Sequence, residues 1–188
     1  MPPKFKFSKE QIIDASIEIL REKGSEALTA RALAQKLESS AKPIFTLFKN
    51  MKELEEEVIC KANELYEAFI EKGMAEGKYP PYKASGMAYI MFAKEEKELF
   101  KLLFMRDRSR ENIEENREPF RPFIEMLMKN LNVDEDTAFQ FHLELWLFVH
   151  GIATMLVTSY LEWDIEFIDK ALSDAYLGLK SKFSLKEE

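Results

Sequence analysis

Several features that indicate other classes of protein are scarce in this sequence. It has one cysteine, Cys60, so no internal disulfide can form, and we expect a reducing compartment, the cytoplasm. Only 6 Gly and 7 Pro occur among 188 residues, too few for a fibrous or low-complexity chain. No uninterrupted apolar run approaches the roughly 20 residues that span a bilayer. The N-terminus, MPPKFKFSKE, lacks the apolar segment of a signal peptide. These absences predict an ordered cytoplasmic protein without a membrane partner.

The sequence also lacks the usual signatures of catalysis. Its two histidines, His142 and His150, are eight residues apart, and no cysteine or carboxylate accompanies them at the spacing of a metal site. We find no glycine-rich phosphate loop and no nucleophile elbow. Carboxylate runs such as Glu55–Glu57 are typical of solvated helix faces. The sequence therefore predicts no metal, no cofactor and no enzymatic activity.

Positive charge is concentrated at the N-terminal end. Residues 1–50 contain nine Lys and Arg against six Asp and Glu, whereas residues 51–188 contain eighteen against twenty-eight. The whole chain has a net charge of −7. A basic segment followed by an acidic one is typical of a nucleic-acid-binding module joined to another domain, although chance clustering would give the same counts.

Helical periodicity dominates the chain, and no strand-like alternation stands out. The sequence is 46% hydrophobic and 32% charged. Ser8 and Gln11 form a capping box that predicts a first helix ending at Gly24, and Thr29 is placed to cap a second, short helix through Leu37. A long helix follows from about Met51 to Lys72, and the further predicted helices lie near 82–95, 96–106, 119–131, 134–160 and 164–182. The polar segment 106–118 is interpreted as a loop or a ragged helix end. The sequence predicts an all-α protein.

The stretch 38–50, ESSAKPIFTLFKN, predicts a third short helix. With Ser40 as its cap, Pro43 falls at the third helical position, where a missing N–H costs no intrahelical hydrogen bond. Ile44 and Phe48, four residues apart, would face the core together with Leu33 and Leu37. Lys42, Pro43 and Thr46 would then face outward.

Three short helices whose third begins with a lysine have the geometry of a helix-turn-helix domain. In that arrangement the first residues of the third helix reach base edges in the major groove. Hydroxyls and backbone N–H groups at the helix starts, Thr29 and Ser40, would meet phosphates, and Arg31, Lys49 and Lys52 would flank the same surface. The alternative is a three-helix bundle whose Lys42 faces water.

The segment 28–50, LTARALAQKLESSAKPIFTLFKN, resembles the DNA-binding domain of the TetR family of transcription regulators. The resemblance extends to IIDASIEILREKG before this segment and KELEEEV after it. It implies a helix-turn-helix domain at 1–50, joined by a long fourth helix to a helical effector-binding and dimerisation domain at 51–188. It further implies a homodimeric repressor that a small ligand releases from its operator DNA. The DNA contacts implied by matching positions are Thr29, Arg31, Ser40, Lys42, Pro43, Phe45 and Lys49.

Three positions depart from the family pattern. Glu38 occupies the turn position where the family usually has glycine, which predicts strain in the turn and adds negative charge beside the DNA. Phe45 replaces the common tyrosine and Leu47 the common histidine, so two polar contacts are absent. These departures keep a second function open, a helical ligand-binding or protein-interaction module that has lost specific DNA binding.

The predicted helix at 134–160 is apolar on nearly every side, which requires two packing partners. Ala171, Ala175 and Gly178 form a small-residue strip on the last predicted helix. We therefore expect the helices near 134–160 and 164–182 to form a four-helix bundle between two copies of the chain. The WLFVHG run at 146–151 resembles a motif of many TetR-type C-terminal domains and supports the same assignment.

Flexible and aromatic side chains suggest an interior for an unknown small, largely apolar effector. The candidate ligand-binding residues are Met87, Met91, Phe92, Phe100, Phe104, Trp146 and His150, with Met105 on the same segment. For each of them a place in a filled hydrophobic core is the simpler interpretation, and His150 with Trp146 is expected to form an interior pair.

Overall fold

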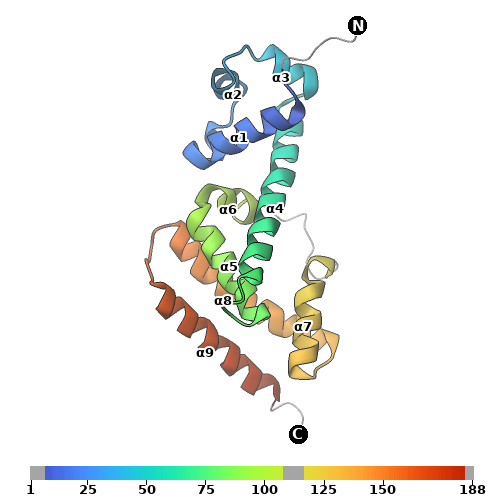
Figure 1. Cartoon of the computed structure of the whole chain (residues 1–188), viewed down its shortest axis with the longest axis vertical. Coiled ribbons are helices and arrows are strands. Elements are labelled where there is room, and N and C mark those ends of the chain that lie inside the picture. The colour runs from blue at the N-terminus through green and yellow to red at the C-terminus, as the bar shows by residue number, and fades with distance from the viewer. Residues whose placement is uncertain (1–6, 108–116, 185–188) are drawn as a thin grey trace. The chain divides into compact units, whose positions relative to one another are not determined.

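The computed structural model describes residues 7–107 and 117–184 of the chain. Every regular element in these residues is a helix, which confirms the all-α prediction (Figure 1). Most of the polar segment 106–118 lies outside the described residues, so its predicted loop is not assessed.

The chain divides into two compact units. The first, called the head unit below, comprises Met1–Ala68 and Glu96–Arg106; the second, called the body unit, comprises Phe69–Glu95 and Asp107–Glu188. The long helix α4 (Met51–Ala75) contributes to both units. The division predicted from the sequence separates a DNA-binding domain (1–50) from an effector-binding and dimerisation domain (51–188). It concerns function and not compactness, and it stays a prediction.

The first two helices of the head unit begin where the sequence predicts. Helix α1 (Lys9–Lys23) starts with a capping box, in which Ser8 Oγ accepts from the backbone N–H of Gln11 and the Gln11 side chain accepts from that of Ser8. Gly24 ends it with a φ of 78°. After the short 3-10 helix η1 (Ser25–Ala27), helix α2 (Ala30–Lys36) is capped by Thr29, whose Oγ1 accepts from the N–H of Ala32 at 3.1 Å.

The predicted cap of the third helix is wrong. Helix α3 (Lys42–Leu47) has Ala41 as its N-cap, which offers no side-chain acceptor, and Pro43 occupies the first turn one position earlier than predicted. The link from α2 is longer than expected because Glu38 and Ser39 still donate backbone hydrogen bonds to Gln35 and Ala34. The physical explanation for the proline is unchanged, since no N–H in the first turn has an intrahelical acceptor.

The core of the head unit is built from buried residues of α1, α2, α3, the first part of α4, and α6 (Lys97–Phe104). Helix α1 contacts both α2 and α6. The side chains of Ile12, Leu33, Ile44 and Leu54 are 0% exposed and that of Phe48 is 1% exposed. Each such buried aliphatic side chain contributes about 1.5–3 kcal/mol of hydrophobic stabilisation, which is enough to fix the orientation of a helix of six residues.

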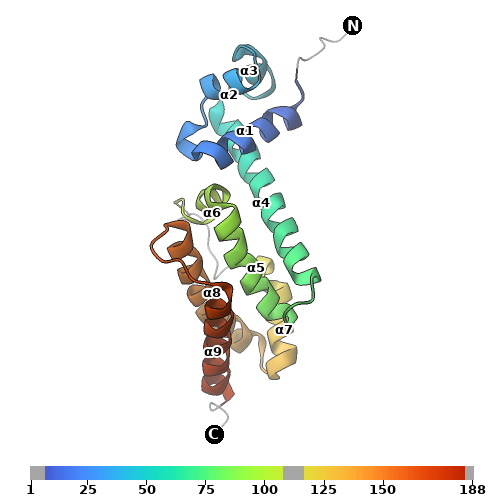
Figure 2. The same cartoon turned by 60° about the vertical axis from the view of Figure 1, so that its left-hand side comes forward.

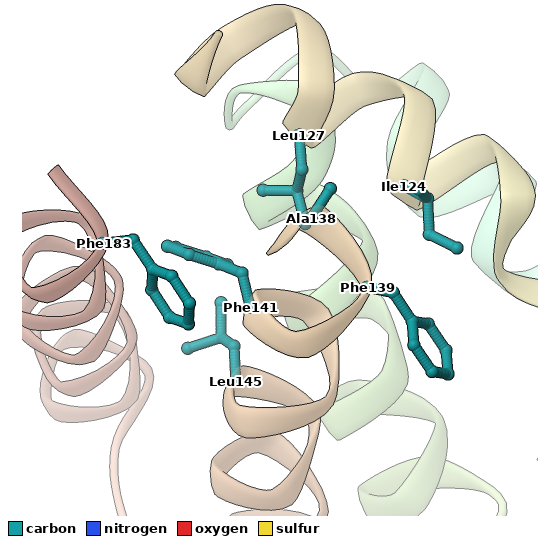
Figure 3. Packing of buried hydrophobic residues seen from close by; sticks show 7 residues of the cluster. All are labelled: Ile124, Leu127, Ala138, Phe139, Phe141, Leu145 and Phe183. Atoms are coloured by element: carbon teal, nitrogen blue, oxygen red, sulfur yellow. The ribbon is translucent and has the colours of Figure 1, made fainter. Parts of the chain in front are cut away.

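The body unit is organised around helix α8 (Glu135–Val157). Helix α8 contacts α5 (Pro81–Glu95), α7 (Arg121–Leu131) and α9 (Ile165–Ser184), and a short 3-10 helix, η2 (Glu118–Phe120), precedes α7. Helices α8 and α9 lie side by side in both views (Figures 1 and 2). Figure 3 shows one part of the core, where Phe141 of α8 faces Phe183 of α9 and Ala138 meets Leu127 of α7.

Helix α8 is long and apolar enough, by length and composition alone, to cross a membrane. It has 23 residues and a most apolar window with a mean hydropathy of 1.2, although no uninterrupted apolar run reaches this length. Because α8 packs against three other helices of the body unit, its position in the core explains the buried part of its apolar surface, which is 44% of this window.

Helix α4 extends past its predicted end at Lys72. Gly73 lies within the helix, and a Cβ atom at this position would come within 2.7 Å of the Cβ of Ala88 on α5. The glycine therefore permits close approach of two helices in the body unit, where the sequence suggested a break. The remaining predicted helices begin and end within three residues of the observed ones.

Candidate nucleic-acid interface and apolar interior

Helix α3 has one buried and one exposed side, as the sequence predicts. Ile44 and Phe48 are buried, whereas Lys42 and Thr46 are exposed and the Phe45 ring is 46% exposed. Pro43 is half-buried. The exposed side thus presents a cation and an aromatic ring in the first turn of the helix, the part of a recognition helix that meets base edges.

The cations next to this helix are available to an external partner. Arg31, Lys42 and Lys49 are exposed, and none of them forms an ion pair with a residue that the structure describes. Lys36 behaves differently, because its Nζ lies 2.8 Å from Glu18 and 3.2 Å from Glu22. Its pKa is raised by these hydrogen bonds.

The hydroxyls assigned to DNA contacts occupy different settings. Thr29 is exposed, and its Oγ1 accepts the Ala32 N–H, which leaves its hydroxyl hydrogen free to donate to a phosphate. Ser40 is exposed and lies in the link before α3. Lys49 lies two residues before the first residue of α4, and its backbone N–H donates to the Glu53 side chain at 2.7 Å.

The turn between α2 and α3 confirms the predicted strain at Glu38. Its φ is 48°, in the left-handed region that favours glycine. Its N–H donates to Gln35 and the N–H of Ser39 donates to Ala34 at 2.9 Å. This pair of bonds is the Schellman motif, in which glycine is the preferred residue at the position that Glu38 occupies.

The predicted ligand-binding residues are divided between the two units. Phe100 and Phe104 belong to the head unit, where their rings are 5.0 Å apart and Phe104 meets Tyr66 edge-on at 5.1 Å. Phe100 is completely buried. These two residues are therefore part of the aromatic packing between α6 and α4 in the head unit.

The other five predicted ligand-binding residues belong to the body unit. Met87 and Phe92 are buried, Met91 is half-buried, and Phe92 meets Phe69 edge-on at 5.5 Å. The expected pair of Trp146 and His150 is present as a stack with ring centroids 5.0 Å apart. The role of all seven residues in ligand binding stays a prediction.

Both histidines of the chain are held by tyrosines, which the sequence analysis missed. The Tyr89 hydroxyl is 2.9 Å from His150 Nδ1, and the Tyr82 hydroxyl is 3.0 Å from His142 Nδ1. The tyrosines are seven residues apart on α5 and the histidines eight apart on α8. Both intervals are about two helical turns, so this spacing was a signal that could have identified the two pairs.

Burial controls the ionisation of the Tyr82–His142 pair. His142 is only 8% exposed, and desolvation lowers its pKa from 6.5 to about 4. Burial also raises the pKa of Tyr82. The two side chains therefore form a neutral hydrogen-bonded pair at pH 7.

Apolar side chains remain exposed on α8 and α9. On α8, Leu147 is 64% exposed and Phe148 42%; on α9, Phe167 is 50% and Leu177 60% exposed. A Cβ atom at Gly178 would meet nothing within 4 Å. Large apolar side chains exposed on two helices that contact each other are candidates for a surface of association.

The structure offers no obvious metal site within residues 7–107 and 117–184, where no group of three or more His, Cys, Asp or Glu side chains could hold an ion.

Comparison with known proteins gives matches in sequence and in fold. A sequence model of a family, described as "Tetracyclin repressor-like, C-terminal domain", matches residues 82–175, half of the chain. A TetR-family protein structure from Vibrio parahaemolyticus has a TM-score of 0.61 and 15% identity, covering 90% of this chain and 97% of that one. A TetR-family member from Streptomyces coelicolor A3 has a TM-score of 0.59 and 17% identity, covering 90% and 98%. No curated protein matches the sequence.

Proposed function

Because the chain belongs to the TetR family of transcriptional regulators, we propose that it is a homodimeric repressor that binds operator DNA through α3 and is released by a small, largely apolar ligand. It acts in the cytoplasm as a regulator and not as an enzyme. The observation that carries this proposal is the two-sided helix α3, in which Ile44 and Phe48 fix the buried side and Lys42 and Phe45 remain exposed.

Three exposed basic side chains support the DNA-binding part of the proposal. Arg31, Lys42 and Lys49 are exposed and unpaired among the described residues, so binding to phosphates breaks no ion pair of theirs. Each such contact releases condensed counterions from the DNA. Thr29 and Ser40 add hydroxyl donors, and Phe45 and Pro43 add apolar contacts for a thymine methyl group.

Fluorescence anisotropy tests DNA binding directly. The full chain is titrated with the DNA upstream of its own gene and with a scrambled duplex over a series of salt concentrations. We expect selective binding that weakens steeply with salt, and about a tenfold loss of affinity for Lys42→Ala. Lys129→Ala, which removes the same charge from an exposed position on α7, is the matched control and is expected to bind normally.

Equal, weak binding to the upstream and scrambled duplexes, unchanged in Lys42→Ala, would contradict the proposal. That result would favour the second function considered above, a helical interaction module. The features that favour this alternative are the net charge of −7, the negative charge of Glu38 in the turn before α3, and the loss of two polar contacts at Phe45 and Leu47.

The exposed apolar residues of α8 and α9 support dimerisation. Leu147 and Phe148 on α8, with Phe167 and Leu177 on α9, would be removed from water by a second copy of the same two helices. A dimer also supplies two DNA-binding heads, which a pseudo-palindromic operator requires.

Sedimentation velocity at micromolar concentration tests this interface. We expect the native chain to be a dimer. In Leu177→Glu we expect the dissociation constant of the dimer to rise at least tenfold, because a carboxylate would be buried in the interface without a partner. Lys129→Glu, at an exposed position on α7 outside the proposed interface, is the control for added negative charge. A monomeric native chain would contradict the dimer.

A further inference from the structure

One buried polar atom in the body unit has no explanation within the fold. Among the described residues, two buried side-chain atoms lack a hydrogen-bond partner, Asp169 Oδ1 and His142 Nε2. The first forms an ion pair with Lys83, which accounts for it. His142 Nε2 is left unpartnered on a side chain that is 8% exposed. Native proteins leave few such atoms unpaired, because each costs about 1–3 kcal/mol.

Counting donors identifies which hydrogen is unpaired. Among the described residues, the Tyr82 hydroxyl has one hydrogen-bond partner, His142 Nδ1, at 3.0 Å. If the hydroxyl donates to Nδ1, the single N–H of the neutral imidazole lies on Nε2. The other tautomer would leave both the hydroxyl hydrogen and the Nε2 lone pair without partners. The first arrangement leaves fewer unpaired groups, so Nε2–H is a buried donor without an acceptor.

The imidazole that carries this donor lies among aromatic rings. Phe123 stacks on the imidazole with ring centroids 5.4 Å apart and planes at 9°, and Phe120 lies 5.3 Å away. Both phenyl rings are only half-buried, and they belong to η2 and to the start of α7. One neutral donor among aromatic rings is the pattern by which apolar binding sites fix the orientation of a ligand.

We propose that His142 Nε2–H anchors the effector, and that the effector is an uncharged, largely aromatic molecule with a hydrogen-bond-accepting oxygen that packs against Phe120 and Phe123. This inference rests on the proposed release of the protein by a small ligand and specifies its chemistry. It differs from the candidate set based on Trp146 and His150, because those two residues already stack on each other and His150 is held by Tyr89.

Two pairs of shape-matched compounds test the proposal. Acetophenone and α-methylstyrene differ by a carbonyl against a carbon–carbon double bond, as do benzophenone and 1,1-diphenylethylene. Each is titrated into the full chain labelled with ¹⁵N-histidine, in which only two imidazoles give signals. We expect at least one ketone to bind about tenfold more tightly than its hydrocarbon partner, and to shift the Nε2–H resonance of His142.

The variant His142→Phe keeps an aromatic ring and removes the donor, so we expect it to bind both members of each pair equally. Should it fail to fold, Tyr82→Phe provides a second variant. Without the hydroxyl the imidazole is free to change tautomer, and the preference for the ketone is expected to fall. The binding and resonance measurements on the native chain do not depend on either variant.

Equal affinity for both members of both pairs, binding of none of the four compounds, or an unshifted His142 resonance would each overturn the proposal. These measurements contain no DNA, so their failure leaves the operator-binding result intact. Conversely, a chain that does not bind DNA can still show the His142 response.

Discussion

Glu38 occupies a backbone conformation that glycine adopts at lower cost, and Glu38→Gly isolates this cost. A residue other than glycine in the left-handed region is destabilised by about 1–2 kcal/mol. Replacing Glu38 by glycine removes this cost, but about 0.5–1 kcal/mol of the resulting stabilisation is lost again because glycine has more conformational freedom in the unfolded chain. Because the φ of 48° and both hydrogen bonds of the turn persist in the variant, we expect a net stabilisation of about 0.5–1 kcal/mol.

Thermal unfolding followed by circular dichroism measures this change. For a chain of this length, the expected gain corresponds to a rise in Tm of about 1–4 °C. Hydrogen exchange at the amides of Glu38 and Ser39 locates the effect, since both donate within the turn. Slower exchange of these amides in the variant is expected.

Two controls separate backbone strain from charge. Glu38→Gln removes the negative charge and keeps a Cβ atom, so it is expected to raise DNA affinity without the gain in Tm. Asn132→Gly tests a residue that tolerates the left-handed region, with a φ of 56° at the end of α7, and a change of only a few tenths of a kcal/mol is expected. The reasoning would be refuted if Glu38→Gly left Tm unchanged, or if Glu38→Gln reproduced its full gain.

Two further predictions concern the body unit. His142 has a pKa of about 4 when folded against 6.5 when unfolded, so its contribution is complete above pH 6.5 and is lost as the pH falls toward 4. Linkage gives a loss of about 2 kcal/mol between pH 7.5 and 5, which urea unfolding would detect and His142→Phe would remove; an equal slope in that variant would exclude His142 as the cause. At Gly73, a Cβ atom 2.7 Å from that of Ala88 predicts that Gly73→Ala lowers stability by about 1–2 kcal/mol in the same assay. Adding Ala88→Gly is expected to restore most of the loss, and no restoration would indicate a different source of strain.

Sequence patterns determine much of the head unit because its helices carry local signals. Ser8 with Gln11, and Thr29, are caps whose hydrogen bonds lie within three residues of each helix start, so they could be predicted from spacing alone. The orientation of α3 followed from the four-residue interval between Ile44 and Phe48.

The start of α3 was placed incorrectly because two local preferences compete there. Ser40 is a good N-cap residue, whereas Ala41 is a poor one, and propensity favoured the former. The backbone N–H groups of Glu38 and Ser39 close the end of α2 with the Schellman motif, and α3 begins one residue later than predicted. A turn held by a glutamate in a left-handed conformation has no sequence signal of its own, except the absence of the expected glycine.

Long-range packing explains what the sequence could not place. The long helix was predicted to end at Lys72, whereas α4 continues through Gly73. The partner that Gly73 approaches, Ala88, lies on another helix fifteen residues further along the chain. Phe100 and Phe104 likewise belong to a different unit from the other predicted ligand-binding residues, because α6 contacts α1 in the head unit. This contact between distant segments has no local sequence signal.

The hydrogen-bond partners of the two histidines could not be predicted from composition. Their spacing on α8 argued against a standard metal site. The same interval of about two helical turns separates Tyr82 and Tyr89 on α5, so each histidine lies opposite one of these tyrosines. His150 also stacks on Trp146, so its ring is held on two sides. His142 has one nitrogen satisfied by Tyr82 and the other buried without a partner. An unpaired donor is costly, and no described residue accepts a hydrogen bond from this one, so an acceptor outside the chain is the simplest reason for its position.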